Sequence, residues 1–375
     1  MDSLTQIALG SAVSVAVMGR RTAVWKAALW GAIGGTLPDL DAFIDHGDPI
    51  LNMVRHRAES HSLLFLTLAA PLLAWVVSRI HGDSGGFRRR ATPALESAPS
   101  RGSDPHRSGA PDSRAQREDA WGPDFLRWTL ALWLVLFTHP LLDAMTVYGT
   151  QLLQPFTSFP FAVGSIFIID PAYTVPLIVG VVAALRLKNA RGQRWNAAGL
   201  VLSTLYLAWS FGAQQHATQV ARASLASQNI SAQGLLVTPS PFNTVLWRLV
   251  ATTPTHYHEG YYSLLDEQVE VRWTAHPRGA DLIAQHGHTP PVARIAAFSH
   301  GFFSLQNGHN RLLLTDLRMG LEPTYTFRFD IGAPAAVGST PVTQLSMRPD
   351  LNRTLPWLWQ RLQGNTRVIL GAAAP

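Results

Sequence analysis

Six apolar segments constrain the fold of this chain more than any other feature of its sequence. They lie at about residues 4–19, 27–44, 62–80, 126–147, 161–187 and 197–213. Hydrophobic residues make up 47% of the chain and charged residues only 14%, a balance that favours a membrane protein over a soluble enzyme. Several segments are shorter than the about 20 residues that a spanning helix usually needs. A buried bundle of soluble helices is the alternative, which the length and hydropathy of the segments disfavour.

The basic residues fall in alternate connections between these segments. The first, third and fifth connections carry Arg20, Arg21 and Lys26, then Arg79 and Arg88 to Arg90, then Arg186, Lys188, Arg191 and Arg194. The second connection has only Arg55 and Arg57, and the fourth, at about 148–160, has no Lys or Arg. Because positively charged loops stay in the cytoplasm, the second and fourth connections are expected outside. Six spans then place the N-terminus and the C-terminal domain on that outer side, which in a Gram-negative host is the periplasm.

Two stretches differ in composition from the apolar segments. Residues 82–124 are rich in Gly, Pro, Ser and Arg and have few large apolar side chains, which predicts a disordered cytoplasmic linker. An amphipathic stretch at 215–228 is followed by β-like runs at 261–273, 292–305, 310–317 and 324–331, which indicate a small mixed domain.

We therefore predict a mainly α membrane protein, a polytopic helical bundle of about six segments with a small C-terminal α+β domain. Its parts are membrane helices 1–3 at 1–81, the linker at 82–124, membrane helices 4–6 at 125–214 and an extramembrane α+β domain at 215–375.

Composition excludes several kinds of site. The sequence contains no cysteine, so disulfides and thiolate metal sites are excluded, and His and carboxylates are the strong side-chain ligands that remain. The formal charge is +6, but the arginines lie between apolar runs and form no single basic face, which argues against nucleic-acid binding. The start Met1-Asp2-Ser3 has neither the basic leader nor the cleavage site of a secretory signal, so we expect it to be retained.

Two carboxylates follow the second apolar segment at a helix break. In Gly35-Thr36-Leu37-Pro38-Asp39-Leu40-Asp41, Asp39 and Asp41 are two residues apart. On a continuous helix they point to opposite sides. Pro38 favours a local extended turn or a new helix start, and either brings both carboxylates toward one point. The alternative is a helix cap with one solvated Asp.

Two histidines precede the third apolar segment. In His56-Arg57-Ala58-Glu59-Ser60-His61-Ser62 they are five residues apart, which puts their rings about 140° apart on an ideal helix. Shared metal ligation by His56 and His61 therefore requires a loop or a bent helix start. Two solvated loop histidines are the alternative, because this spacing alone is a weak metal motif.

A histidine and an aspartate lie within the fourth apolar segment. In Thr138-His139-Pro140-Leu141-Leu142-Asp143 they are four residues apart and share one helical face. An Asp at the centre of a membrane helix costs about 2.5–3.5 kcal/mol on insertion scales, so an intramembrane His and Asp pair indicates a functional site. Structural hydrogen bonding between helices is the alternative.

The topology inferred from Lys and Arg places all three motifs at the same outer face. The six candidate ligands are Asp39, Asp41, His56, His61, His139 and Asp143. Carboxylates and imidazoles gathered at one depth repel or take up protons unless a cation holds them. This N/O mixture suits Zn²⁺, Mn²⁺ or Fe, as one ion or two. We therefore predict a divalent metal cofactor, with Zn²⁺ or Mn²⁺ favoured.

These motifs, together with the opening Met1-Asp2-Ser3-Leu4-Thr5-Gln6, resemble the bacterial LexA-regulated, membrane-bound metal-dependent hydrolases (YdjM-like). The resemblance covers about residues 1–215 and includes Tyr148-Gly149-Thr150-Gln151 and Ile169-Asp170-Pro171. It implies an inner-membrane location and a metal-dependent hydrolase. It departs at Ala58-Glu59, where the family pattern has a Gly and an apolar or aromatic residue. A carboxylate there is expected to alter metal affinity or access.

Metal-assisted hydrolysis needs a base beside the ion. The ion lowers the pKa of bound water toward neutrality, and a carboxylate such as Asp41 or Glu59 takes the proton. Asp170 either orients a metal-bound His or caps the helix that starts at Pro171. A site at the membrane surface implies an amphiphilic partner, a phospholipid or another lipid-linked phosphoester.

Three other classes of function remain open. A transporter or metal carrier uses intramembrane His and Asp as an ion path, but such sites lie near the midplane between repeats, and no repeat is visible in the sequence. A membrane di-iron oxidase usually needs more histidines than these three motifs supply. A structural anchor that presents the C-terminal domain predicts full function without the ligands. The sequence predicts no oligomeric state.

Overall fold

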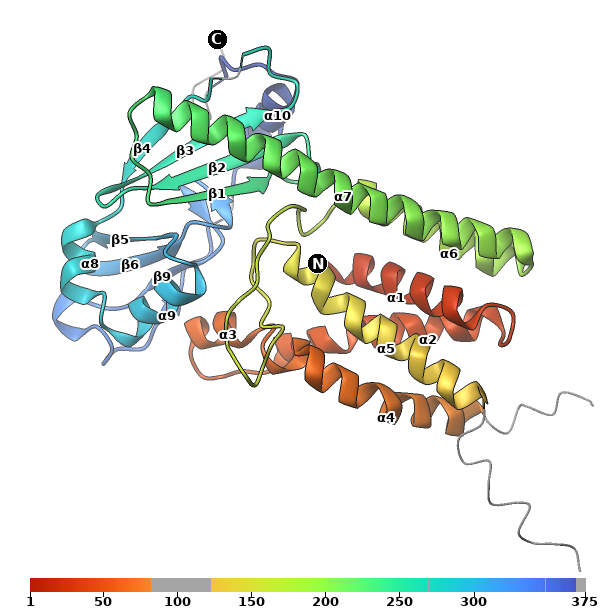
Figure 1. Cartoon of the computed structure of the whole chain (residues 1–375). Helices are drawn as coiled ribbons and strands as arrows, with labels where there is room; N and C mark the ends of the chain where they lie inside the picture. Colours follow the sequence, from red (N-terminus) through yellow and green to blue (C-terminus); the bar gives the residue numbers. More distant parts are fainter. Residues whose placement is uncertain (82–122, 269, 348, 369–375) are drawn as a thin grey trace, which may run out of the picture.

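The computed structural model describes residues 1–81, 123–268, 270–347 and 349–368. A helical part comes first and a part with β-sheets follows, and one long helix belongs to both (Figure 1). The mainly helical architecture with a C-terminal sheet region is therefore confirmed. The predicted linker at 82–124 lies, except for its last two residues, outside the described residues.

Six helices of the described chain overlap the predicted apolar segments. They are α1 (Ser3–Met18), α2 (Val24–Thr36), α4 (Leu63–His81), α5 (Pro123–Ala144), α6 (Pro171–Leu187) and α7 (Ala190–Ser227). Of the helices in the described ranges, only α4 and α5 are both long and apolar enough to cross a membrane. Helices α1 and α6 have 16 and 17 residues, and such helices reach about 25 Å against a hydrocarbon core of about 30 Å. The expected bundle of six spanning segments is therefore not confirmed.

The outer surface of these helices is apolar. On α4, Leu68, Leu72 and Trp75 are 61%, 69% and 52% exposed. The inward faces form one core, in which Ala12 and Val15 of α1 pack with residues of α2, α5 and α6. Helices that are apolar on both faces are typical of lipid surroundings.

Three predicted segments have other boundaries in the structure. Helix α2 ends at Thr36, and the six residues after Leu37 form the 3-10 helix η1 (Pro38–Phe43), because Pro38 cannot donate the next helical hydrogen bond. Residues 161–170 are irregular, and α6 starts at Pro171. The expected boundary at 214/215 falls inside α7, whose 38 residues extend about 57 Å.

Close glycine packing sets the approach of α1 to α2. A Cβ atom on Gly31 would lie 2.2 Å from the Gly10 carbonyl oxygen, and one on Gly35 would lie 2.5 Å from that of Gln6. No larger residue fits at these crossings without moving a helix. The contact holds the end of α2, and hence η1, against α1.

The C-terminal part contains two antiparallel sheets. The first has the order β1 (Gly234–Pro239), β2 (Leu246–Thr252), β3 (His256–Ser263) and β4 (Thr274–Pro277). The second has the order β10 (Thr343–Gln344), β9 (Arg328–Asp330), β6 (Arg311–Asp316) and β5 (Phe303–Gly308). A hairpin of β7 (Gly320–Leu321) and β8 (Thr324–Tyr325) and helices α8 (Ala280–His286), α9 (Pro290–Phe298) and α10 (Leu351–Leu362) complete it. The last half of α7 lies across the first sheet (Figure 1).

Two of the strand predictions were wrong in part. The run at 292–305 forms α9 and then β5, since Val292, Ile295 and Phe298 are buried at a helical spacing of three. In the run at 261–273, residues 261–263 end β3, and the other residues that the structure describes there precede β4 without forming a strand.

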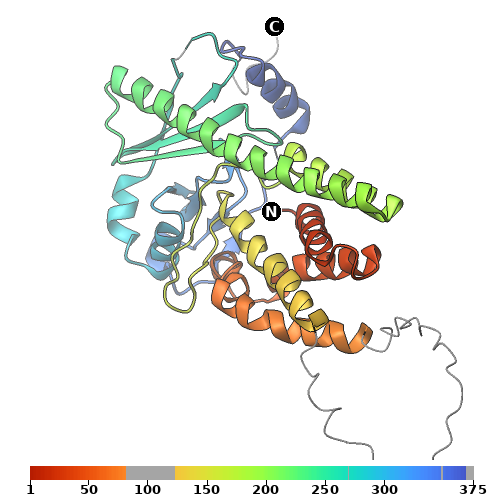
Figure 2. The ribbon, with the colours of Figure 1, turned by 45° about the vertical axis from the view of Figure 1, so that its right-hand side comes forward.

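The second sheet packs against the helical part at the end where α5 finishes (Figure 2). Ile50 and Met53 of α3 (Pro49–Arg55) and Tyr148 join the core formed by α9, β5, β6 and β9. The buried Arg318 pairs with Asp316 and donates to the Tyr148 carbonyl oxygen at 2.9 Å. The loop that follows α5 is thereby fixed by the C-terminal part.

Candidate metal centre

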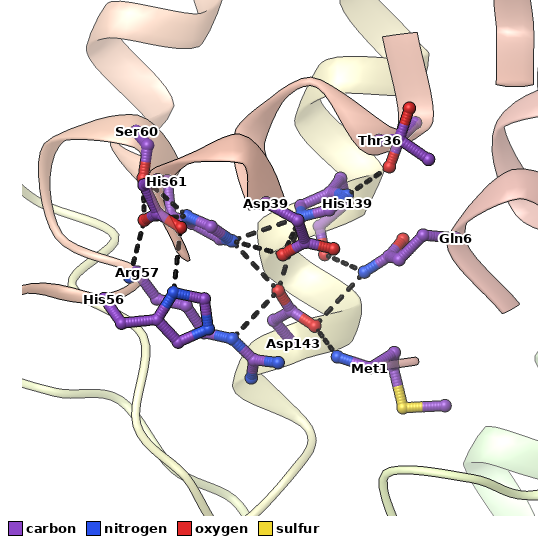
Figure 3. A network of polar contacts seen from close by, with 12 residues as sticks. Met1, Gln6, Thr36, Asp39, His56, Arg57, Ser60, His61, His139 and Asp143 are labelled. Atoms are coloured by element: carbon purple, nitrogen blue, oxygen red, sulfur yellow. Dashed lines mark hydrogen bonds and ion pairs between the residues drawn. The ribbon is translucent and has the colours of Figure 1, made fainter. Parts of the chain in front are cut away.

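Two carboxylates and two imidazoles point at one another where η1, α5 and the second 3-10 helix meet (Figure 3). We call Asp39, His61, His139 and Asp143 the His/Asp group. One ligand atom from each lies within 4.8 Å of all the others. His61, His139 and Asp143 are buried, and the Asp39 side chain is 20% exposed.

The separations within the His/Asp group fit a single metal ion. His61 Nε2 lies 3.1 Å from His139 Nε2, 3.1 Å from Asp143 Oδ2 and 3.4 Å from Asp39 Oδ1. His139 Nε2 lies 3.4 Å from Asp143 Oδ2 and 3.5 Å from Asp39 Oδ1. Tetrahedral Zn²⁺ with bonds of about 2.05 Å has ligand atoms about 3.3 Å apart, and an octahedral ion with bonds of about 2.1 Å has neighbouring ligands about 3.0 Å apart. The five distances therefore suit either geometry, and they do not identify the metal.

His139 is oriented as a metal ligand requires. It lies in the last two turns of α5, four residues before Asp143. Its Nδ1 donates to the Gly35 carbonyl oxygen at 2.7 Å, since a carbonyl only accepts, and this bond turns Nε2 toward the other members of the group. A hydrogen bond at one ring nitrogen that fixes the other for metal is the usual arrangement for a ligating histidine.

His61 is oriented through its neighbour Ser60. It ends η2 (Glu59–His61), and its Nδ1 lies 2.8 Å from Ser60 Oγ, which in turn donates to Asp41 Oδ2. Asp41 Oδ2 is itself 3.6 Å from His61 Nδ1. This chain places the proton on Nδ1 and leaves Nε2 to face the His/Asp group.

One oxygen of Asp143 faces three buried nitrogens, of His61, His139 and Arg57, without a well-aligned hydrogen bond from any of them. Oδ1 accepts from Gln6 Nε2 at 3.1 Å and contacts the Met1 amine. Oδ2 is buried and accepts no hydrogen bond from any described residue. A buried acceptor of this kind calls for an explanation, and a cation between Oδ2 and the two Nε2 atoms supplies one.

The other sequence-predicted residues lie beside the His/Asp group. In a 3-10 helix residues two apart point about 120° from each other, so Asp39 faces the group while Asp41 faces His56 Nδ1 at 2.8 Å and the Arg57 backbone N at 2.9 Å. His56 therefore contacts Asp41 and is not one of the four converging residues. Glu59 at the unusual Ala58-Glu59 pair is exposed.

Asp170 caps α6. It accepts from the Ala172 backbone N at 3.0 Å and from the Tyr206 hydroxyl at 2.8 Å. Of its two sequence interpretations, the helix cap is the one that these contacts support, and the described contacts include none with a histidine of the group.

Neighbouring polar groups shift the pKa of Asp41 and of His61, two residues that lie outside the apolar helices. Burial raises the pKa of Asp41, but hydrogen bonds from His56, His61 and Ser60 outweigh it and hold that pKa well below its usual range. Burial lowers the pKa of His61, but its contacts with Asp143, Asp39 and Asp41 outweigh burial and raise that pKa to about 9. In the metal-free protein His61 is therefore protonated at neutral pH.

Three buried polar residues near the group were missed as site residues from sequence. Gln6 is 1% exposed and binds Asp143, and Arg57 is 3% exposed and lies 3.5 Å from Asp143 Oδ2 through Nε. Tyr148 is 7% exposed, and the Cζ atom of Arg57 lies over its ring, 5.0 Å from the ring centre. The sequence signal for Gln6 was a polar residue inside an apolar segment, which by itself indicates function.

A cavity of about 400 Å³ opens beside the centre. Its polar lining includes Asp41 and His56, and its apolar lining includes Phe43, Ile44 and Phe327. Phe327 belongs to the C-terminal part, so the two parts of the chain share this cavity.

The helical part and the His/Asp group together define the class: a helical protein whose described residues include two helices long and apolar enough to cross a membrane, and a buried cluster of carboxylates and imidazoles that could hold a metal ion. The family model for the YdjM inner membrane protein matches residues 1–217. The chain belongs to this family, which confirms the resemblance seen in the sequence. The matched range contains all four members of the group and ends within α7. No curated protein and no solved structure matches the chain.

Proposed function

We propose that the protein is a metal-dependent hydrolase of the inner membrane that cleaves an ester or phosphoester of a membrane lipid or lipid-linked substrate. The observation that carries the proposal is the convergence of two Nε2 atoms and two carboxylates at metal-ligand separations. Asp143 Oδ2 supports it, because this buried oxygen faces both Nε2 atoms and makes no well-aligned hydrogen bond. The C-terminal domain and the centre are proposed to face the periplasm.

Asp39, His61, His139 and Asp143 would hold one divalent ion. When bound, such an ion lowers the pKa of water and polarises the scissile bond. Asp41 keeps His61 in the ligating tautomer through Ser60, and it also binds Nδ1 of His56. The side chain of His56 is 23% exposed and lines the cavity, so Nε2 of His56 is placed to take a proton from water or give one to the leaving group. We therefore assign the acid/base role to the His56–Asp41 pair, since the other predicted base, Glu59, does not line the cavity.

The cavity beside the centre suits an amphiphilic substrate. Phe43 and Ile44 line it and are 85% and 56% exposed. These side chains are placed to meet an acyl chain, while the polar end of the substrate reaches Asp41 and His56. Apolar walls with a few placed polar groups are typical of small-molecule sites.

A chelation experiment tests this function. The detergent-purified chain is assayed against carboxylic-ester and phosphoester lipids before chelation, after chelation, and after Zn²⁺ or Mn²⁺ is restored. We expect hydrolysis to disappear on chelation and to return with the metal. Hydrolysis that persists at the same rate in fully metal-free protein would contradict the proposal.

A further inference from the structure

Arg57 is a buried cation next to the His/Asp group, and nothing in the function proposed above uses it. Its side chain is 3% exposed and its backbone has φ of 64°. A left-handed conformation costs a non-glycine residue free energy, and such residues concentrate at functional sites. The backbone is held there by the bond from Arg57 N to Asp41 Oδ2 and by Gln151 N, which donates to the Arg57 carbonyl oxygen at 2.9 Å.

The guanidinium of Arg57 has few partners of its own. Its face lies over the Tyr148 ring, and one terminal nitrogen donates to Thr146 Oγ1 at a long 3.4 Å. Its Nε is buried and has no hydrogen-bond partner among the described residues. Its nearest opposite charge is Asp143 Oδ2, at 3.5 Å.

The same oxygen of Asp143 faces the candidate metal. Oδ2 lies 3.1 Å from His61 Nε2 and 3.4 Å from His139 Nε2, whereas Oδ1 is engaged by Gln6 and the Met1 amine. A divalent ion bound by Asp39 and Asp143 neutralises two negative charges. Arg57 then loses its counter-charge while it stays buried, and a buried unpaired cation is strongly unfavourable.

We infer that Arg57 binds an oxygen of an anionic phosphoryl group, so that the proposed hydrolase acts on phosphoesters. This inference rests on the metal centre of the proposed function. A bound metal ion neutralises Asp143, and a phosphoryl oxygen gives Arg57 a new negative partner. The planar guanidinium also matches the geometry of a phosphate group. An uncharged carboxylic ester brings no such charge. The cavity lining includes Tyr148 but not Arg57, and the Arg57 guanidinium lies over the Tyr148 ring, 5.0 Å from the ring centre.

This arrangement predicts that metal and phosphate each raise the affinity of the protein for the other. If metal binding releases Arg57 for phosphate, phosphate must tighten metal binding by the same factor. Inorganic phosphate is the simplest probe, and it needs no turnover.

The experiment titrates inorganic phosphate into the full-length, detergent-purified chain by calorimetry, with and without Zn²⁺ or Mn²⁺, and titrates the metal with and without phosphate. We expect phosphate to bind at least tenfold more tightly to the metal-loaded protein, and phosphate to raise metal affinity equally. Short-chain phosphatidylglycerol below its micelle concentration is a second arm. Tighter binding of that lipid than of phosphate identifies a lipid headgroup as the source, and weaker binding identifies a soluble phosphoester.

Variants test whether the Arg57 side chain itself binds the phosphate. We expect Arg57→Gln to keep metal binding and to lose phosphate binding at least tenfold, and Arg57→Lys to lose less. Arg55→Gln, at an exposed position two residues earlier, is expected to change neither. Metal uptake with no mutual effect of phosphate in the wild-type protein overturns this inference alone, even if the Arg57 variants do not fold. Absence of metal uptake overturns the proposed function and this inference with it.

Discussion

His56 and Asp41 form a pair at the cavity, adjacent to the His/Asp group. The Nδ1 to Oδ1 distance of 2.8 Å leaves Nε2 of His56 for proton transfer. We predict that His56→Gln lowers the hydrolysis rate by about 10²-fold or more, the usual size of general acid–base catalysis, and leaves metal content unchanged. Rate and metal content are measured on the same preparation. His46→Gln, the same change in a residue outside the cavity lining, is the control. Loss of metal in the His56 variant would make His56 a ligand instead.

His61 gives metal binding a pH dependence. Its pKa in the metal-free protein is raised to about 9, so below that pH the metal must displace a proton from Nε2. We predict that metal uptake at pH 7 releases a proton and that apparent affinity rises up to about tenfold per pH unit until about pH 9. Calorimetry in buffers with different ionisation enthalpies measures the released proton. Uptake with no proton release and no dependence on pH between 6 and 9 would show that His61 does not ligate through that nitrogen.

Sequence reasoning at this scale succeeded where spacing alone fixes geometry. His139 and Asp143 are four apart on one helix, and the structure brings His139 Nε2 to 3.4 Å from Asp143 Oδ2. Sequence reasoning could not tell which of Asp39 and Asp41 faces the His/Asp group. Their directions depend on a 3-10 helix, whereas spacing arguments assume an α-helix or a strand. Arg57 was not predicted as a site residue because its buried position depends on a left-handed backbone and on a contact with Tyr148, far along the chain.

At the scale of elements, the contact of α1 with α2 sets the position of the Gly35 carbonyl that orients His139. We predict that Gly31→Ala lowers the free energy of unfolding by about 1–3 kcal/mol, the usual cost of overpacking, and weakens metal retention. Thermal unfolding and metal content in detergent measure both effects.

Gly212 of α7 offers a matched control. A Cβ atom there meets nothing within 4 Å, so Gly212→Ala is expected to leave stability unchanged or to raise it by up to about 1 kcal/mol. Equal effects of the two substitutions would show that the packing of α1 against α2 is not the cause.

The types of the apolar elements were predictable from sequence, and several boundaries were not. Pro38 signalled a break, but the predicted segment ran on to residue 44 because its apolar composition continues. One helix, α7, covers both the predicted segment at 197–213 and the amphipathic stretch at 215–228, since no proline interrupts them. Its first part packs against helices and its last part against the first sheet. The run at 292–305 was assigned to a strand from its composition, whereas burial over 292–298 follows a helical period and only its last residues belong to β5.

At the scale of the whole molecule, the last turns of α5, which carry His139 and Asp143, lie at the end of the helical part that is nearest to the C-terminal sheets (Figure 1). The charge pattern predicts that this end faces the periplasm. The chain has no cysteine, so a single introduced cysteine is the one thiol in it that a maleimide can label, and its labelling reports on which side of the membrane it lies. We predict that Ser158→Cys and Asn307→Cys react with an impermeant maleimide in intact cells, and that Ala190→Cys reacts only after lysis. The reverse pattern would place the centre in the cytoplasm.

The central claim is that the His/Asp group binds a metal ion, and metal analysis of the purified chain tests it most directly. After loading and removal of free metal, we predict about one Zn²⁺ or Mn²⁺ per chain, as four converging ligands require. His139→Ala is predicted to lose at least about nine-tenths of it with unchanged helical content, because a ligand is removed. His256→Ala, in an exposed position of β3, is predicted to retain it. Wild-type protein without bound metal, or a His139 variant with undiminished metal, would contradict the account.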